Sequence, residues 1–238
     1  MIRDPVLEVI ACSVDDAIAA AEGGAGRLEV VRELERGGLT PPVDLVRDIQ
    51  RAVSLPLRVM VRESDAHGYT VRDRVEHDAL CAAAKAFHAL GVDGLVLGFL
   101  TDGEVDLELT QSILDCAPGV HATFHHAFDD AADQLRALER LKRCPQVDRV
   151  LTSGGPGDLS VKRDRLVRYT TAGESQITAL VGGGVDRMLI ESLAPAGLRE
   201  FHVGRAARMD RQMSGRVSAA LVRALVDVLP ATERSSLG

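Results

Sequence analysis

Charged and imidazole side chains lie within short apolar segments of this sequence, where a hydrophobic core would not select them. Glu8 and Glu29 are each flanked by aliphatic residues. Arg62 and His125 lie toward the ends of two further apolar segments, and Asp129 follows the second of these. Burying a charge is costly unless it is paired. The sequence therefore predicts one of two arrangements. One is a buried polar network, in which Arg62 would neutralise Glu8 and Glu29. The other is a carboxylate–guanidinium–imidazole site for a small anionic or hydroxylated ligand.

The adjacent histidines His125 and His126 cannot share one direction on a strand, because successive side chains point to opposite faces. Thr123 has the same parity as His125. We expect His125 to point into the interior, and His126 to contact the helices or a loop.

Each of these residues has a role in an enzymatic interpretation. His125 would be the acid–base group, because histidine titrates near neutral pH. Glu8 or Glu29 would be a second acid–base group or would orient the ligand. Arg62 would bind an anion. Asp129 would either touch the ligand or cap a helix, for which aspartate is a preferred residue.

A segment of three consecutive glycines, together with a later Gly-Arg pair, suggests an anion site. The residues are Gly182, Gly183, Gly184, Gly204 and Arg205. In many α/β barrels the loops after the seventh and eighth strands bind phosphate through backbone N–H groups. Glycines permit close approach of the backbone, and Arg205 adds a positive charge. The alternative is that these glycines only form a tight exit from a strand.

A dedicated metal site has less support. The chain contains four cysteines, Cys12, Cys81, Cys116 and Cys144. They form no CxxC pair, which predicts buried free thiols and no disulfide framework. Met209 and Met213 are four residues apart and could share one helical face. Glu8, Glu29 and His125 could together hold a harder divalent ion.

Composition narrows the class of protein. The chain has 238 residues, 46% of them hydrophobic, and a net charge of −7. Acidic and basic residues are interspersed, which argues against nucleic acid or a membrane surface as a partner. No segment approaches the roughly 20 apolar residues that span a bilayer, and no apolar signal-peptide core precedes the first predicted strand. We therefore expect a cytoplasmic protein with one domain.

Short apolar segments alternate with longer segments of helical period along the chain. The predicted strands are Val6–Ala11, Arg27–Val31, Leu57–Arg62, Leu95–Leu100, Ala122–Ala127, Arg149–Thr152, Ile177–Val181 and Glu200–Val203. Eight such units predict a parallel sheet that closes into a TIM-type (β/α)8 barrel, with the site at the carboxyl ends of its strands. An open doubly wound sheet is the alternative, but the first strand–helix turn lacks a glycine-rich dinucleotide fingerprint.

Several helices can be placed from their start signals and apolar faces. Ser13, Pro42 with Asp44, and Asp129 with Asp130 are predicted to open helices. The clearest helix is Arg72–Leu90. Its predicted apolar stripe consists of Val75, Ala79, Ala83, Phe87 and Leu90.

The sequence resembles the CutC copper-homeostasis family. The motifs that carry the resemblance lie in family order from about residue 5 to about residue 205, and they include Leu7-Glu8-Val9, Glu22–Glu29, Gly37–Pro41, Val59–Arg62, Gly94–Gly98, Thr123–His125, Ala127–Asp129, Val150–Gly154 and Gly182–Val185. A segment from about residue 206 matches poorly. The resemblance implies an α/β barrel, a cytosolic protein linked to copper, and a homodimer or larger homo-oligomer. It also marks Glu8, Glu29, Arg62, His125 and Asp129 as positions of the family's polar motifs.

The chain departs from the family at positions that bear on copper. Family members often carry cysteine where this chain has Ile10 and Val31, and arginine where it has His126. Cys12, two residues beyond the first of these positions, is then the candidate ligand for copper(I). Two functions remain open. One is copper homeostasis, with or without direct binding of Cu(I). The other is a barrel enzyme (a lyase, isomerase or hydrolase) acting on a small phosphorylated or polyhydroxylated metabolite.

Overall fold

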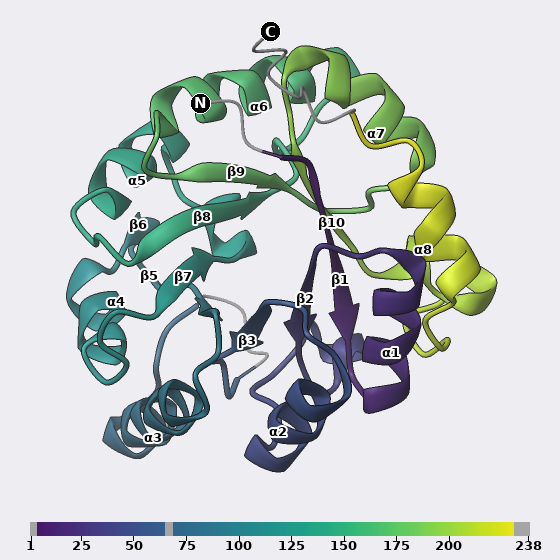
Figure 1. Ribbon diagram of the computed structural model, residues 1–238. Coiled ribbons are helices and arrows are strands. Elements are labelled where there is room, and N and C mark those ends of the chain that lie inside the picture. The colour runs from purple at the N-terminus through teal and green to yellow at the C-terminus, as the bar shows by residue number, and fades with distance from the viewer. Residues whose placement is uncertain (1–3, 65–68, 231–238) are drawn as a thin grey trace, which may run out of the picture.

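A closed barrel of eight parallel strands forms the centre of the computed structural model, which describes residues 4–64 and 69–230 (Figure 1). The barrel strands are β1 (Val6–Ala11), β2 (Arg27–Val30), β3 (Leu57–Met60), β4 (Gly94–Leu97), β7 (His121–Phe124), β8 (Val147–Thr152), β9 (Thr178–Val181) and β10 (Glu200–Val203). Around the barrel they run in sequence order, and β10 pairs with β1 to close it. The predicted TIM-type fold is confirmed.

One α-helix follows each barrel strand and packs on the outside of the barrel (Figure 1). The helices are α1 (Val14–Gly23), α2 (Val43–Ala52), α3 (Arg74–Leu90), α4 (Leu107–Leu114), α5 (Gln134–Leu141), α6 (Leu159–Gly173), α7 (Arg187–Leu193) and α8 (Ala219–Val226). Short 3-10 turns lie in the loops: η1 (Leu34–Arg36), η2 (His126–Phe128), η3 (Ala194–Ala196), η4 (Arg205–Ala207) and η5 (Met209–Arg211). No helix among the described residues is long and apolar enough to cross a membrane.

The predicted strands all exist, but some boundaries differ. Strand β7 ends at Phe124, three residues before the predicted end at Ala127, because the chain turns into η2 there. A small antiparallel hairpin, β5 (Leu100–Thr101) with β6 (Glu104–Val105), lies between β4 and α4 and was not expected.

The predicted apolar stripe of α3 is wrong in its first half, whereas Phe87 is buried and Ala83 and Leu90 pack against the core as expected. Val75 is 78% exposed. The face that packs on the barrel consists of Glu76, Leu80, Cys81, Ala84 and Phe87. Alanines lie on several sides of this helix, so its apolar pattern fits two neighbouring faces. The position of α3 on the barrel selects between them.

Two of the three predicted helix starts are confirmed. The Ser13 side chain accepts a hydrogen bond from the Asp16 N–H and caps α1, and Pro42 precedes α2 with Asp44 in its first turn. The third prediction is wrong, because no α-helix begins at Asp129 or Asp130. Helix α5 begins at Gln134 and is capped by Asp133.

Side chains alternate across the barrel wall, as the strand period requires. On β1, Leu7, Val9 and Ala11 are buried in the layer between barrel and helices. Ile10 points the other way, into a small cluster inside the barrel with Val31, Met60 and Val96. The interior positions nearer the amino ends of the strands carry buried charged side chains, among them Glu8, Arg27, Arg58 and Glu200.

The segment after β10 is attached to α1 through one buried carboxylate. Asp16 accepts hydrogen bonds from Arg208 Nη1 (3.1 Å) and Val217 N (3.0 Å). Met209 belongs to η5, whereas Met213 lies outside it, so the predicted shared helical face of these methionines is wrong.

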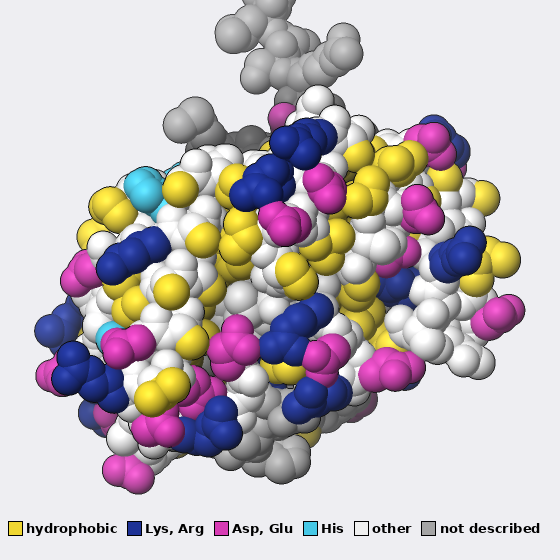
Figure 2. Space-filling model, turned by 90° about the horizontal axis from the view of Figure 1, so that it is seen from below, with side chains coloured by type: hydrophobic (Ala, Val, Ile, Leu, Met, Phe, Trp, Pro, Cys, Tyr) yellow, Lys and Arg dark blue, Asp and Glu magenta, His cyan; other side chains and the backbone are white. Residues whose placement is uncertain are grey.

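Acidic and basic side chains alternate over the outer surface. The face below α1, α2 and α3 in Figure 1 shows both signs of charge interspersed with apolar side chains (Figure 2). This pattern agrees with the interspersed charges of the sequence.

Candidate functional site

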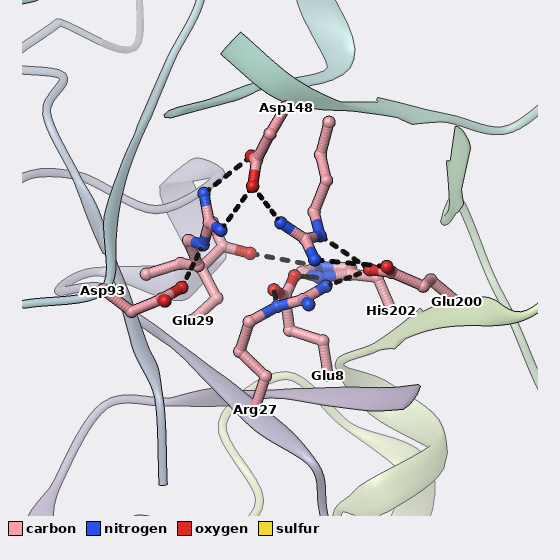
Figure 3. A network of polar contacts seen from close by, with 9 residues as sticks. Glu8, Arg27, Glu29, Asp93, Asp148, Glu200 and His202 are labelled. Carbon is pink, nitrogen blue, oxygen red and sulfur yellow. Dashed lines mark hydrogen bonds and ion pairs between the residues drawn. The ribbon is translucent and has the colours of Figure 1, made fainter. Parts of the chain in front are cut away.

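A network of buried ion pairs crosses the interior of the barrel (Figure 3). Arg27 on β2 contacts Glu8 on β1 through Nε and Glu200 on β10 through Nη2, the latter at 2.7 Å. Arg149 on β8 also contacts Glu200, with Nε at 2.7 Å from Oε2. These side chains come from strands far apart in sequence, and the closure of the barrel brings them together.

Arg58 extends the network to the amino ends of the strands. Its guanidinium donates two hydrogen bonds of 2.9 Å to Asp148, and Nε lies 2.7 Å from Asp93 Oδ2. The prediction that Arg62 would neutralise Glu8 and Glu29 is wrong. Arg62 lies beyond the last residue of β3, where its guanidinium contacts Gly37 O (3.3 Å) and lies 6.0 Å from the Tyr69 ring centre.

His202 on β10 joins this network to the carboxyl ends of the strands. Its Nδ1 lies 2.8 Å from Glu8 Oε1, and its Nε2 lies 3.3 Å from Glu29 Oε2. Burial opposes the charged imidazole, but Glu29 and Glu8 outweigh it and raise the pKa of His202. The structure therefore favours an imidazolium held between two carboxylates.

The two glutamates have different pKa shifts. Burial alone would raise the pKa of Glu8, but Arg27 and His202 together lower it. Burial raises the pKa of Glu29, and His202 only partly offsets this. Glu8 is therefore a fixed anion, whereas Glu29 is the carboxylate of the pair that more readily takes up a proton.

A cavity of about 730 Å³ lies at the carboxyl ends of the strands, above this pair. Its polar lining includes Glu29, Arg62, His125, His126, His202 and Arg205. Three of the five predicted catalytic residues therefore reach the cavity directly. The other two, Glu8 and Asp129, lie behind it and contact His202 and His126 respectively.

His125 reaches the cavity in a form that does not suit the predicted role of acid–base group. Its Nδ1 accepts a hydrogen bond from Ala127 N (3.1 Å), which leaves the proton of the neutral ring on Nε2. Burial, together with Arg62 and His126, lowers the pKa of His125 to about 3. At neutral pH the ring is uncharged, so it is suited to donate a hydrogen bond and not to supply a proton.

His126 contacts Asp129 in the loop after β7, which agrees with the expected loop contact, but it also lines the cavity, which was not expected. The strand alternation does not apply to it, because it begins η2. Its Nδ1 lies 3.5 Å from Asp129 Oδ2. Asp129 is itself held by Ser153, whose N–H (2.8 Å) and Oγ–H (2.7 Å) both donate to it. Burial would raise the pKa of Asp129, but hydrogen bonds from His126, Thr152 and Ser153 lower it.

The predicted anion site lies at the same mouth. Gly183, Gly184, Gly204 and Arg205 line the cavity, and Gly183 and Gly184 have φ of +76° and +95°. Gly182 lies beneath them, where a β-carbon would come within 2.5 Å of Leu151. Only glycine adopts the positive φ angles of Gly183 and Gly184 readily, so the local backbone explains two of these glycines. The approach of a ligand would explain why the loop opens onto the cavity.

The lining of the cavity favours an anionic ligand. Four arginines face it, Arg36, Arg62, Arg205 and Arg211, against two carboxylates, Glu29 and Asp186. Neither Arg205 nor Arg211 forms an ion pair with a carboxylate in the described part of the chain.

Among residues 4–64 and 69–230, three candidate metal-ligating side chains (His, Cys, Asp or Glu) converge in one group. Glu8, Glu29 and His202 each offer an atom within 4.8 Å of the others. The predicted trio contained His125 in place of His202, and the structure corrects that choice. A cation there would compete with the Arg27 guanidinium for Glu8, and with the proton that the raised pKa of His202 favours on its ring.

Cys12, the predicted copper ligand, is not part of this group. Its thiol is half-buried and receives a contact from Arg208 Nη2 at 3.7 Å. Burial raises the pKa of Cys12, which Arg208 only partly offsets.

Sequence reasoning missed the partners that make the site work. Five residues were not predicted as site residues: Arg27, Arg58, Arg149, Glu200 and His202. A signal was present, because Arg27 and Glu29, and likewise Glu200 and His202, are spaced two apart in strands and therefore face the same side. Charged residues at that spacing identify the interior face of both strands.

The chain was compared with known proteins. The model of the CutC family matches residues 6–207. The human copper homeostasis protein cutC homolog is 34% identical over 216 residues, which cover 90% of this chain and 78% of the relative. A CutC family protein of Xylella fastidiosa is 34% identical over 198 residues, covering 82% and 73%. The solved structure of the copper homeostasis protein CutC of Streptococcus agalactiae superposes with a TM-score of 0.76 at 22% identity, covering 83% of this chain and 97% of that one.

Proposed function

The chain belongs to the CutC family, and we propose that it acts in copper homeostasis through a small anionic metabolite bound at the barrel mouth. The relatives named for copper homeostasis support the first part of the proposal. One observation carries the second part: the cavity of about 730 Å³ opens directly onto the buried Glu29–His202 pair. A volume in this range is typical of small-molecule sites.

The ligand class follows from the charges around the mouth. Arg62, Arg205 and Arg211 offer guanidinium donors that match carboxylate and phosphate groups. The positive-φ glycines Gly183 and Gly184 leave the backbone open to close approach. A phosphorylated or carboxylated, hydroxyl-bearing metabolite fits this lining better than a soft metal ion, which prefers sulfur ligands.

The reaction that the site supports is proton transfer. The Glu29–His202 pair can donate a proton to the ligand and take it back, because the pKa of each group is raised and the pair reaches the cavity. His126, oriented by Asp129, provides a second imidazole in the lining of the same cavity. His125 would donate a neutral hydrogen bond to a developing oxyanion. This arrangement suits an isomerase or a lyase.

Cellular location and assembly complete the proposal. We infer a cytoplasmic protein that forms a homodimer or a larger homo-oligomer. The interspersed charges of the surface and the family resemblance support this. Multi-angle light scattering of the purified chain would measure the oligomer.

A thermal-shift screen tests the proposed ligand class. Phosphorylated and carboxylated sugars and their neutral parent sugars would be compared on the wild-type chain. We expect at least one anionic compound to raise the Tm, and we expect Arg205→Ala to abolish that shift because the ligand anion loses a guanidinium donor of the cavity lining. Arg163→Ala removes an exposed arginine of α6 that does not line the cavity and is the matched control.

The same ligand then separates binding from chemistry. Glu29→Gln keeps the shape of the lining and removes the titrating carboxyl group. Such a variant should bind the ligand but lose exchange of its carbon-bound hydrogens with solvent deuterium, measured by NMR. The proposal fails if anionic compounds shift the Tm of the wild type and of Arg205→Ala equally.

A further inference from the structure

Two thiols lie next to each other outside the barrel, between α3 and α4. Cys81 is a buried residue of α3, and Cys116 is a half-buried residue just after α4. Both Sγ atoms lie near the same carbonyl oxygen, that of Ser112, at 3.9 Å and 3.5 Å. Thirty-five positions separate them in the sequence, which is why the thiols did not look like a cluster; the packing of α3 on α4 brings them together.

An imidazole lies beside the Cys81 thiol. His77 is four residues before Cys81 on α3, a spacing that places two side chains on one helical face. The Cys81 Sγ is 3.9 Å from both ring nitrogens of His77, and Nε2 lies 3.0 Å from the Ser112 hydroxyl. The His77 side chain is 33% exposed, so the group opens to solvent on this side.

The Cys81 thiol is protonated at neutral pH. Burial, together with a hydrogen bond and electrostatic repulsion from the Cys116 thiol, raises the pKa of Cys81 to about 12. A thiol in this state is a poor nucleophile. A cation that binds sulfur strongly would displace the protons, because metal ligation requires thiolates.

The structure assigns this pair a ligand: we propose that Cys81 and Cys116 bind one Cu(I) ion through their two sulfur atoms. Thiolates favour soft and borderline cations, and Cu(I) is one of them. Each S–H releases its proton to solvent as an S–Cu bond forms, so two thiolates and one Cu(I) carry a net charge of −1. Lys85, whose charge acts on Cys81, partly balances it.

The choice of copper among soft cations rests on the copper part of the proposed function, whereas the site itself does not involve the barrel mouth. Neither Cys81 nor Cys116 lines the cavity of about 730 Å³. The two proposals can therefore fail separately.

Competition with a chromogenic Cu(I) chelator, under anaerobic and reducing conditions, tests the site. We expect the wild-type chain to take one equivalent of Cu(I) from bathocuproine disulfonate, and X-ray absorption to show sulfur ligands. Cys81→Ser with Cys116→Ser should lower the affinity at least 100-fold. Cys12→Ser and Cys144→Ser each remove a thiol elsewhere in the fold and should leave the affinity unchanged. Far-UV circular dichroism checks that each variant is folded.

Two results would overturn the site. One is that the double variant binds Cu(I) as tightly as the wild type. The other is that Cys12→Ser alone removes the binding, which would place the ion at Cys12. If the double variant misfolds, Cys116→Ser alone decides, because this thiol is only half-buried and its loss should still weaken binding more than tenfold. A metabolite-induced rise in Tm that persists in the Cys116→Ser variant would show that ligand binding at the barrel mouth does not depend on the Cu(I) site.

Discussion

His202 shows how a single residue can connect a structural network to a reactive cavity. Glu8 holds one ring nitrogen from inside the network, and Glu29 faces the other at the cavity. The same imidazolium that neutralises two buried carboxylates is thus also the group nearest the ligand space. A histidine in this position makes the charge of the site depend on pH.

We predict that this dependence is visible in stability. The pKa of His202 is raised in the folded state. Its stabilising contribution is therefore fully present below the unfolded pKa of about 6.5, and it is lost as the pH rises through the folded pKa. His202→Gln should remove this part of the pH profile, measured as the free energy of unfolding in urea from pH 5.5 to 9.

An exposed histidine is the control for that measurement. His88 lies on the outer side of α3, so His88→Gln should keep the wild-type profile. A His202→Gln profile that runs parallel to the wild type would contradict the placement of a charged imidazole between the two glutamates.

At the scale of elements, the contact between α1 and α8 joins the beginning of the described chain to its end. Gly23 ends α1 where α8 passes closest, and a β-carbon there would lie 2.5 Å from Val222 Cβ. Gly173 ends α6 in open surroundings, where the nearest atom to a β-carbon is Ile177 Cβ at 3.6 Å. Neither glycine has a positive φ.

Alanine at these two positions should therefore have opposite effects. Gly173→Ala should stabilise the protein by up to about 1 kcal/mol, because alanine loses less backbone entropy in a helix. Gly23→Ala should destabilise it by about 1–3 kcal/mol despite the same gain, because Val222 and the backbone of α8 must move. Chemical denaturation of both variants measures the difference, and effects of equal sign would refute the close packing of α1 on α8.

At the scale of the whole molecule, the barrel interior is an ionic core enclosed by an apolar shell. Arg27, Arg149 and Glu200 come from strands on different parts of the barrel, and each is largely buried. Breaking one partner of a buried ion pair leaves an uncompensated charge in a region of low dielectric. The network consequently couples closure of the barrel to correct pairing of these side chains.

Glu200→Ala should destabilise the protein by about 3–5 kcal/mol, because Arg27 and Arg149 would then face each other without their shared carboxylate. Glu191→Ala breaks the exposed pair with Arg187 on α7 and should cost at most about 1 kcal/mol. Urea unfolding at neutral pH compares the two. Similar losses in both variants would show that the interior network contributes no more than a surface pair.

The sequence by itself determined the eight strand–helix units, the closed barrel, and the presence of a polar site at the carboxyl ends of the strands. These features follow from local periodicity, since a strand or helix must bury its apolar face wherever the chain goes. The position of Arg62 at the end of an apolar segment also sufficed to place it near the mouth.

Only the tertiary structure decided which charges meet. Glu8 pairs with Arg27 and His202, and not with Arg62, because strand register and barrel closure set which side chains face each other. The exposed and buried sides of α3, the neutral state of His125, and the proximity of Cys81 to Cys116 depend on the same long-range packing. Sequence spacing carries no information about distances across a barrel or between neighbouring helices, and those distances determine the chemistry.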